Sequence, residues 1–288
     1  MLRLLLFLVA FAAGNSTASG QVKVQKDIPY VAHGHARQTL DLYVPAAKHP
    51  VPLLVWVHGG AWKLGSKDWI NVRYLTEHGF AIASVDYRFS SDATFPAQIQ
   101  DCNAALNFLT GNAASYGIDP KRIIIGGGSA GGHLALLLGL ARKRSDFGAD
   151  PSIRPVAIID FFGPVDFLSM LEQVDQTHGR EEAEDNFRRL LGESPAKRPD
   201  LARLASPLAY INSANPPVLI LHGEKDVAVP IQQSQDLSAR LTQAGVSNQL
   251  LIVKGAPHDG PMFATPELQE KVISFLRPLA AQTGNSRD

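Results

Sequence analysis

The chain has 288 residues, which is long enough for one large domain with a substantial hydrophobic core. Its 27 Lys and Arg residues balance its 27 Asp and Glu residues, so the net charge at pH 7 is zero. This balance argues against nucleic acid or an anionic membrane surface as a partner, because either would select a basic protein surface.

The N-terminal segment differs from the rest of the chain. Arg3 precedes an uninterrupted apolar run over residues 4–13, and small and polar residues follow. This pattern is typical of a secretory signal with cleavage after Ala18, and the apolar run is too short to span a bilayer comfortably. We therefore expect residues 1–18 to be a signal peptide and residues 19–288 to be a secreted or periplasmic domain, with no stable membrane insertion after cleavage.

Apolar, β-branched runs alternate with helical patterns along the rest of the chain, which predicts an α/β fold with a mostly parallel sheet flanked by helices. The first run alternates weakly and the second more clearly, which predicts an antiparallel start, whereas the run at 53–57 is continuously apolar, as a central parallel strand is. The predicted strands are 22–28, 39–45, 53–57, 81–85, 123–125, 156–162, 218–221 and 249–253. The main predicted helices are 71–78, 97–112, 181–191, 231–244 and 266–279.

A polar and charged segment separates two of these strands. It covers residues 167–217 and contains helical pieces. Since no other segment is large enough to form a lid, we interpret it as a cap-like insertion over the site rather than a second core.

The sequence Gly127-Gly128-Ser129-Ala130-Gly131 matches the pattern G-x-S-x-G between a predicted buried strand and an apolar helix. In this motif the serine occupies a strained turn that admits only small residues two positions away on either side. The turn exposes the hydroxyl at a helix N-terminus, where partial positive charge favours a developing oxyanion. A phosphate-binding loop is the alternative, but neither the P-loop pattern nor the dinucleotide fingerprint fits.

A second glycine-rich loop, His58-Gly59-Gly60-Ala61-Trp62, follows the predicted strand at 53–57. Glycines allow the backbone to turn two amides toward one point, as a loop that binds an oxyanion requires. The alternative is a simple turn between a strand and a helix, and the position of the loop upstream of Ser129 favours the oxyanion interpretation.

An acid and a histidine follow two later strands. Asp226 comes after the strand at 218–221, and His258 comes after the strand at 249–253. Because parallel strands end at one edge of a sheet, we expect both side chains to lie near Ser129. A serine hydroxyl needs a histidine to accept its proton, and the histidine needs a carboxylate to hold its tautomer.

Other residues compete for these two roles. Asp166 follows the strand at 156–162, which is one strand too early, Glu224 shares the loop of the favoured acid, and Asp259 adjoins the favoured histidine. His133 lies one helical turn after the serine and is expected to pack behind it, whereas His222 ends a strand and is expected to be structural.

Two further polar motifs are interpreted as structural. Asp86-Tyr87-Arg88 ends the strand at 81–85 and is expected to form a corner with an Asp–Arg interaction. His33 and His35 are expected to be exposed loop residues, because no further ligand has matching metal spacing. We therefore expect neither a metal nor a cofactor.

The motifs together resemble the α/β-hydrolase superfamily, in its hormone-sensitive-lipase-like, acetyl-xylan and feruloyl esterase-like branch. The resemblance covers residues 39–279 and rests on residues 58–62, 86–88, 95–97, 127–133, 222–226 and 257–258.

The resemblance implies an α/β-hydrolase fold and oxyanion-binding amides at Gly60, Ala61 and Ala130. The third glycine of the family's loop is Ala61 here, which keeps its N–H but adds a methyl group on the acyl side. Trp62 is expected to form a wall of the substrate pocket.

These observations predict a secreted serine carboxylesterase that hydrolyses short-chain acyl esters through an acyl-enzyme formed on Ser129. The expected substrate is a small ester or an acylated polysaccharide, with acetyl or feruloyl esters of plant polysaccharide as one class. An arylformamidase similar to kynurenine formamidases and a catalytically silent binding module are the alternatives. The signal segment counts against the first alternative, and the presence of Ser129, Asp226 and His258 counts against the second.

Overall fold

The computed structural model describes residues 21–174 and 179–281 of the chain. The predicted signal peptide, residues 1–18, lies outside the described residues. Within the described ranges, no helix combines the length and the apolar character that crossing a membrane requires.

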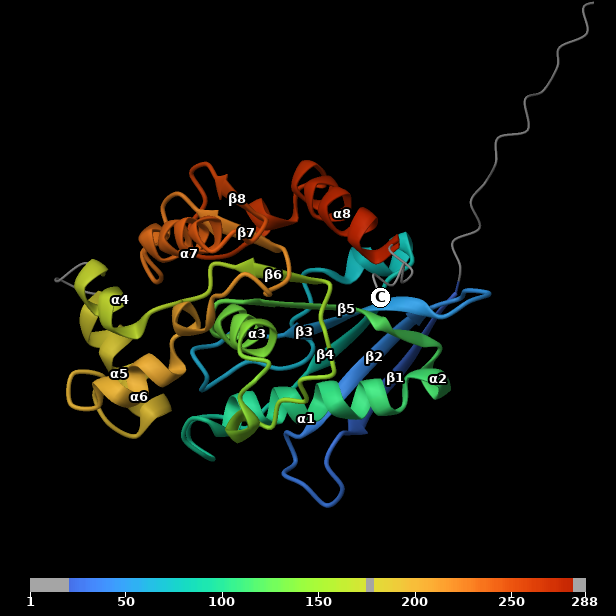
Figure 1. Cartoon of the computed structure of the whole chain (residues 1–288), viewed down its shortest axis with the longest axis horizontal. Coiled ribbons are helices and arrows are strands. Elements are labelled where there is room, and N and C mark those ends of the chain that lie inside the picture. The colour runs from blue at the N-terminus through green and yellow to red at the C-terminus, as the bar shows by residue number, and fades with distance from the viewer. Residues whose placement is uncertain (1–20, 175–178, 282–288) are drawn as a thin grey trace, which may run out of the picture.

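An eight-stranded sheet forms the middle layer of the described chain (Figure 1). Its strand order is β1-β2-β4-β3-β5-β6-β7-β8. Strand β2 pairs antiparallel with both β1 and β4, and all pairings from β4–β3 to β7–β8 are parallel. The strands are β1 Val22–Pro29, β2 Thr39–Pro45, β3 Val51–Val57, β4 Ala81–Val85, β5 Ile118–Gly128, β6 Ala157–Phe161, β7 Val218–Gly223 and β8 Asn248–Val253. The predicted α/β fold, with its antiparallel start and parallel continuation, is confirmed.

Central strands are buried on both faces, which explains why their sequences are continuously apolar. Leu54 of β3 and Ile124 of β5 point into the core on one face, and Val55 and Ile125 point into the core on the other. All four side chains are fully buried. A strand with polar residues at every second position would leave one of these cores without its apolar surface.

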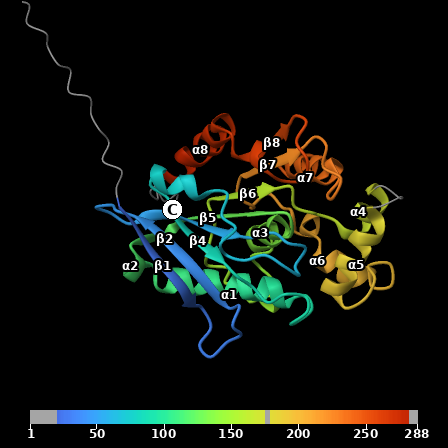
Figure 2. The ribbon, with the colours of Figure 1, turned by 180° about the vertical axis from the view of Figure 1, so that it is seen from behind.

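Helices cover both faces of the sheet, and Figure 2 shows the same layers from behind. Helices α1, α3 and α7 pack on one face, while α8 and the 3₁₀ helix η1 pack on the other. The α-helices outside the cap are α1 Ala97–Gly111, α2 Ala113–Tyr116, α3 Ala130–Leu140, α7 Ile231–Gln243 and α8 Pro266–Ala281. The 3₁₀ helices are η1 Arg73–His78, η2 Ser145–Phe147, η3 Pro207–Tyr210 and η4 Pro261–Ala264. The segment predicted as a helix at 71–78 forms the 3₁₀ helix η1 over Arg73–His78, and Gly79 ends it in the left-handed conformation, with φ of 85°.

The segment between β6 and β7 forms three short helices, α4 Phe167–Gln173, α5 Gly179–Leu191 and α6 Pro199–Ala205. They lie together at one end of the molecule, on the left in Figure 1 and on the right in Figure 2. The rings of Phe167 and Phe187 are stacked with centroids 4.2 Å apart and join α4 to α5. This helical group, here called the cap, occupies the region for which the sequence predicts an insertion.

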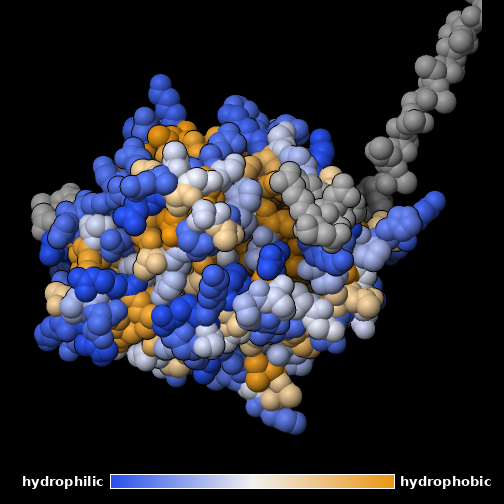
Figure 3. Space-filling model, viewed as in Figure 1, coloured by the Kyte–Doolittle hydropathy of each residue, from blue (hydrophilic) through white to orange (hydrophobic). Residues whose placement is uncertain are grey.

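The surface mixes hydrophilic and hydrophobic residues, and hydrophobic areas are separate from one another on the face seen in Figure 3. Scattered apolar side chains are ordinary on a protein surface. Among the described residues, the exposed large hydrophobic side chains are Val24, Leu64, Trp69, Val227, Ile252 and Met262. Leu64, Trp69 and Val227 line the same pocket, so part of its wall is apolar.

Candidate active site

Ser129 occupies a strained turn between β5 and α3. Its φ of 56° and ψ of −123° are unusual for a residue with a side chain. The turn is tight because Gly127 and Gly131 lie against each other, and a Cβ atom on Gly127 would stand 2.2 Å from the Gly131 carbonyl oxygen. The glycines two positions away on either side are therefore what allows the chain to place the Ser129 hydroxyl at the start of α3.

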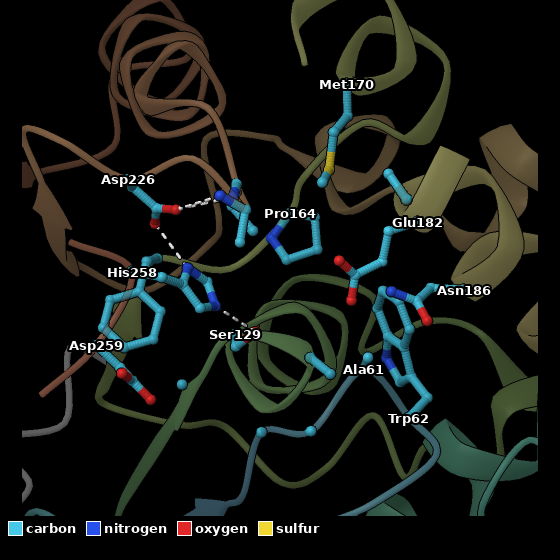
Figure 4. Close-up of a pocket in the computed structure, with 18 of the residues that line it drawn as sticks. Ala61, Trp62, Ser129, Pro164, Met170, Glu182, Asn186, Asp226, His258 and Asp259 are labelled. Carbon is cyan, nitrogen blue, oxygen red and sulfur yellow. Dashed lines mark hydrogen bonds and ion pairs between the residues drawn. The ribbon is translucent and has the colours of Figure 1, made fainter. Parts of the chain in front are cut away.

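Ser129, His258 and Asp226 form a continuous series of hydrogen bonds (Figure 4). The Nε2 atom of His258 is 2.8 Å from Ser129 Oγ, and its Nδ1 atom is 2.7 Å from Asp226 Oδ2. A neutral imidazole satisfies both contacts when Nδ1–H donates to the carboxylate and Nε2 accepts from the hydroxyl. The loops after β5, β7 and β8 thus bring the three predicted residues together at one edge of the sheet, in an arrangement that can move a proton from the serine.

The Asp226 carboxylate is buried, and it accepts hydrogen bonds from several sides. Its Oδ1 atom accepts from the backbone N–H groups of Ala228 and Val229, each at 2.9 Å. Burial alone would raise the pKa of Asp226, but the hydrogen bonds from His222 and His258 outweigh burial and hold the pKa well below its ordinary value. The carboxylate is therefore ionised at neutral pH and can stabilise a positive charge on His258.

His222 has a larger part in this arrangement than its sequence position indicates. Its side chain is completely buried, and its Nε2 atom lies 3.2 Å from Asp226 Oδ2 and 2.8 Å from the Val229 carbonyl oxygen. On the other side of the ring, Nδ1 lies 2.6 Å from Ser234 Oγ. The structural role expected for His222 is therefore to hold the carboxylate of Asp226 in place. A signal for it was present, because His222 lies near the end of β7, four residues before Asp226 in the loop that follows.

The loop after β3 presents free backbone amides to the same pocket. Gly60 and Ala61 have positive φ values of 110° and 49°, and both line the pocket with Ala130. In residues 21–174 and 179–281, the N–H groups of Gly60, Ala61 and Ala130 have no acceptor. Amides left open beside a serine hydroxyl are what an oxyanion would need.

A buried ion pair supports this loop from below. His58 places Nδ1 2.7 Å from the Gly59 carbonyl oxygen and Nε2 3.1 Å from Asp86 Oδ1. Arg37 donates to the same carboxylate oxygen at 3.0 Å. Burial raises the pKa of Asp86, but the hydrogen bond from His58 and the charge of Arg37 outweigh it, so the pKa is lowered. The loop conformation is therefore fixed by charged groups that do not reach the pocket.

The Asp–Arg interaction expected at the Asp86-Tyr87-Arg88 corner is present, but with different partners. Asp86 pairs with an arginine from the loop between β1 and β2, and Arg88 pairs with Asp101 of α1 at 2.7 Å. Such pairs depend on which elements meet in space, so neighbours in the sequence do not reveal them. His33 and His35 are exposed, and the described residues contain no group of three His, Cys, Asp or Glu side chains that could hold a metal ion.

The alternative acids occupy other positions. Asp166 accepts from the Leu168 N–H at 3.0 Å and caps α4, while Glu224 accepts from the Gly255 N–H at 2.8 Å. Asp259 lines the pocket beside His258 (Figure 4). None of the three contacts the imidazole in the described structure, which leaves Asp226 as the acid that does.

His133 lies behind the strained turn, as expected, and it connects two parts of the site. Trp62 Nε1 donates to His133 Nδ1 at 3.2 Å, and His133 Nε2 lies 2.7 Å from the Ala205 carbonyl oxygen of α6. Burial lowers the pKa of His133 to about 4, although the hydrogen bond to Ala205 opposes this shift. The imidazole is therefore neutral at pH 7, with Nδ1 as acceptor and Nε2–H as donor.

These elements surround a pocket of about 1160 Å³ that contains Ser129 and His258. Its walls come from the loop after β3, the strained turn, the cap helices α4 and α5, and the loop after β7. Trp62 lines the pocket, as the sequence predicts, although only 3 % of its surface is exposed. The pocket is large enough for a small-molecule substrate.

Sequence reasoning missed several pocket residues. Phe162 follows β6 with a φ of 46°, and its ring lies 4.7 Å from that of His258. It could have been found, because it ends a predicted strand at the same edge as Ser129. Met170, Glu182 and Asn186 come from the cap, and nothing in the sequence indicates which face of a cap helix meets the pocket.

The sequence and the fold of this chain are similar to those of known proteins. The BD-FAE family model matches residues 40–241. The esterase LipQ of Mycobacterium tuberculosis is 32% identical over 243 residues, which cover 77% of this chain and 53% of LipQ. A probable isoprenylcysteine alpha-carbonyl methylesterase, ICMEL1 of Oryza sativa subsp. japonica, is 33% identical over 255 residues, covering 83% of this chain and 60% of that protein. The chain thus spans little more than half the length of these curated relatives.

A solved structure described as a truncated form of carbohydrate esterase from gut microbiota superposes with a TM-score of 0.82 at 27% identity. The superposition covers 93% of this chain and 99% of that structure, so the α/β-hydrolase fold expected from the sequence is confirmed over nearly the whole domain. The chain therefore belongs to the BD-FAE family of the α/β-hydrolase superfamily.

Proposed function

We propose that this protein is a serine carboxylesterase in which Ser129 is the nucleophile, His258 the general base and acid, and Asp226 the residue that orients the imidazole. The observation that carries the proposal is the hydrogen-bonded series from Ser129 Oγ through His258 to Asp226, at 2.8 Å and 2.7 Å. The names of the relatives support it, because they describe esterases and methylesterases.

The reaction follows from this geometry. Ser129 Oγ attacks the ester carbonyl carbon while His258 Nε2 takes the hydroxyl proton, and the carbonyl oxygen becomes an oxyanion. The N–H groups of Gly60, Ala61 and Ala130 receive that oxyanion, and loss of one such donor typically costs about 3 kcal/mol of transition-state stabilisation. The intermediate then expels the alcohol, which takes the proton from His258.

Hydrolysis of the acyl-enzyme repeats these steps with water in place of the serine. His258 Nε2 removes a proton from the attacking water, and the new tetrahedral intermediate collapses to release the carboxylic acid and restore Ser129. The ionised Asp226 stabilises the imidazolium in both halves of the reaction. Every proton that His258 accepts is returned within the cycle.

We propose short-chain acyl esters as the substrates, with acetyl or feruloyl esters of plant polysaccharide as the natural class. The mixed lining of the pocket supports this proposal, because apolar side chains surround Ser129 and polar groups lie on the cap. The likeness to a structure described as a carbohydrate esterase also supports it.

The test is hydrolysis of p-nitrophenyl acetate, butyrate and decanoate, methyl ferulate and acetylated xylan by the wild type and by Ser129→Ala. The expected result is cleavage of the short esters by the wild type and loss of at least about 1,000-fold in kcat for the variant. A variant that keeps a large part of the rate on every ester would contradict the assignment of Ser129. Faster cleavage of N-formylkynurenine than of any ester would assign the pocket to formamides instead.

We further propose that residues 1–18 direct export. The apolar run after Arg3 and the small residues before Ser19 support this. N-terminal sequencing of protein recovered from the periplasm and the medium of an expressing bacterium checks it. A mature chain that begins at Ser19 is the expected result, and uncleaved protein confined to the cytoplasm would contradict export.

A further inference from the structure

Two polar side chains of the cap helix α5 reach into the pocket although no part of the proposed ester hydrolysis uses them. Glu182 and Asn186 are one helical turn apart, so they lie on the same side of α5. Both line the pocket, and Figure 4 shows both on the opposite side of Ser129 from Asp226. The Glu182 carboxylate points into the cavity in this view.

The packing of α5 fixes this orientation. Ala183 and Phe187 form the neighbouring stripe of the helix and are buried. The Phe187 ring stacks on Phe167 and lies 5.9 Å from the Trp62 ring. Rotation of α5 would expose these apolar side chains, so Glu182 and Asn186 are held toward the pocket by the cap core.

The hydrogen bonds of the pair leave one acceptor group and one donor group free. Lys63 Nζ donates to Asn186 Oδ1 at 2.6 Å, which occupies the amide oxygen and leaves the two N–H groups of its nitrogen available. Within the described residues, the Glu182 carboxylate has neither a hydrogen-bond partner nor an ion-pair partner. A carboxylate and an amide NH₂ group thus stand side by side, open to a ligand.

This combination fits hydroxyl groups. A hydroxyl both donates and accepts, so one hydroxyl or a vicinal pair can donate to Glu182 and accept from Asn186. A purely apolar alcohol would bury both groups without partners, which costs binding energy. A cation would pair with Glu182 but would face the ammonium group of Lys63 and leave the Asn186 donors unused.

We propose that Glu182 and Asn186 form a subsite for the hydroxyl groups of the alcohol part of the substrate, which makes a polyhydroxylated alcohol such as a sugar residue the preferred leaving group. The inference rests on the proposed esterase function. An acetyl group carries no hydroxyl and a feruloyl group carries only one phenolic hydroxyl, whereas a sugar residue carries vicinal hydroxyls that can use both Glu182 and Asn186.

The experiment compares two esters with the same acetyl group and similar ring size, namely methyl β-xyloside carrying one acetyl group and cyclohexyl acetate. The measured quantity is the ratio of kcat/KM for the xyloside to kcat/KM for cyclohexyl acetate. Glu182→Gln and Asn186→Leu are each expected to lower this ratio at least about fivefold, because each weakens or removes a hydrogen bond to a hydroxyl.

Glu181→Gln is the matched control, since it makes the same charge change one position away on α5, at a residue that is exposed like Glu182 but does not line the pocket. Its ratio should equal that of the wild type. Equal ratios in Glu182→Gln, Asn186→Leu and the wild type would overturn the proposal. The substitutions could instead change the ratio of kcat/KM for methyl ferulate to kcat/KM for methyl cinnamate and leave the xyloside ratio unchanged. That result would also overturn the proposal, because Glu182 and Asn186 would then bind the acyl group. Failure of the proposed function is distinguishable, because the wild type would then cleave neither the xyloside nor cyclohexyl acetate, or Ser129→Ala would cleave both as fast as the wild type.

Discussion

Three side chains at the ends of three strands carry the proposed chemistry, and the acid is the most firmly held of them. Asp226 receives two backbone hydrogen bonds, and His222 contacts it from behind. These contacts fix the carboxylate so that its second oxygen faces His258 Nδ1. The carboxylate can therefore hold the imidazole of His258 through Nδ1.

The substitution Asp226→Asn tests this contact. An amide that donates its N–H to Nδ1 would hold the imidazole in the wrong tautomer, so kcat should fall by roughly 1,000- to 10,000-fold with little change in KM. Steady-state rates on p-nitrophenyl acetate measure the effect. Glu224→Gln is the control in the same loop and should keep the wild-type kcat, and a similar loss in both variants would mean that the loop, not the carboxylate, matters.

At the scale of elements, a single neutral histidine joins three parts of the site. His133 of α3 accepts from Trp62 of the loop after β3 and donates to Ala205 of α6. Protonation of Nδ1 would remove the acceptor for Trp62 and place a charge in a fully buried position. The cap and the proposed oxyanion loop are therefore held together by a contact that requires a neutral imidazole.

This contact predicts a specific acid sensitivity. Since the pKa of His133 is lowered to about 4 in the folded protein, the unfolded chain binds more protons between about pH 6.5 and pH 4. The stability contributed by His133 is complete above pH 6.5 and is lost as the pH falls toward 4, by about 3 kcal/mol at most.

Urea unfolding of the wild type and of His133→Gln at pH 7, 6, 5 and 4 measures this effect. Glutamine offers an acceptor and a donor but does not titrate. The free energy of unfolding of the His133→Gln variant should therefore fall less steeply than that of the wild type as the pH is lowered. All other titrating groups contribute equally to the stability of both proteins, so they do not affect the difference between the two curves. Parallel curves for the two proteins would show that His133 does not cause acid sensitivity.

At the scale of the whole molecule, the sheet divides the hydrophobic interior into layers. Ile124 and Ile125 are neighbours in β5, yet Ile124 belongs to the core beneath α8 and η1, and Ile125 belongs to the core beneath α1 and α3. Both side chains are fully buried. Although the two residues are adjacent in the chain, they share no packing layer.

We therefore expect additive effects of Ile124→Val and Ile125→Val. Each substitution should lower the free energy of unfolding by about 1 kcal/mol. The double variant should lose the sum within about 0.5 kcal/mol, because the two cavities open on opposite faces. Urea denaturation of the wild type, the two single variants and the double variant gives the four free energies of unfolding. A deviation from additivity well above about 0.5 kcal/mol would mean that the sheet transmits strain between its faces.

Much of this organisation could be predicted from sequence, because it depends on local patterns. The apolar runs of β3 and β5 predict buried strands, and the positions of Ser129, Asp226 and His258 after β5, β7 and β8 predict their meeting at one edge. These inferences need only the periodicity of strands and the geometry of a parallel sheet.

Other features depend on contacts between distant elements and could not be predicted. The pairing of Arg37 with Asp86 joins residues from two loops, and the contact of His133 with Ala205 requires the cap to be in place. The face that α5 turns toward the pocket depends on the stacking of Phe187 in the cap core. Sequence patterns show that such helices form, but not which neighbours they meet.

The central claim is that Ser129 becomes covalently acylated. The most direct test is to treat the wild type and Ser129→Ala with an alkyl fluorophosphonate and to locate the added mass by peptide mass spectrometry. The account predicts one phosphonyl group per wild-type chain, on the peptide that contains Ser129, and none on the variant. A label on another residue, or equal labelling of both proteins, would contradict it.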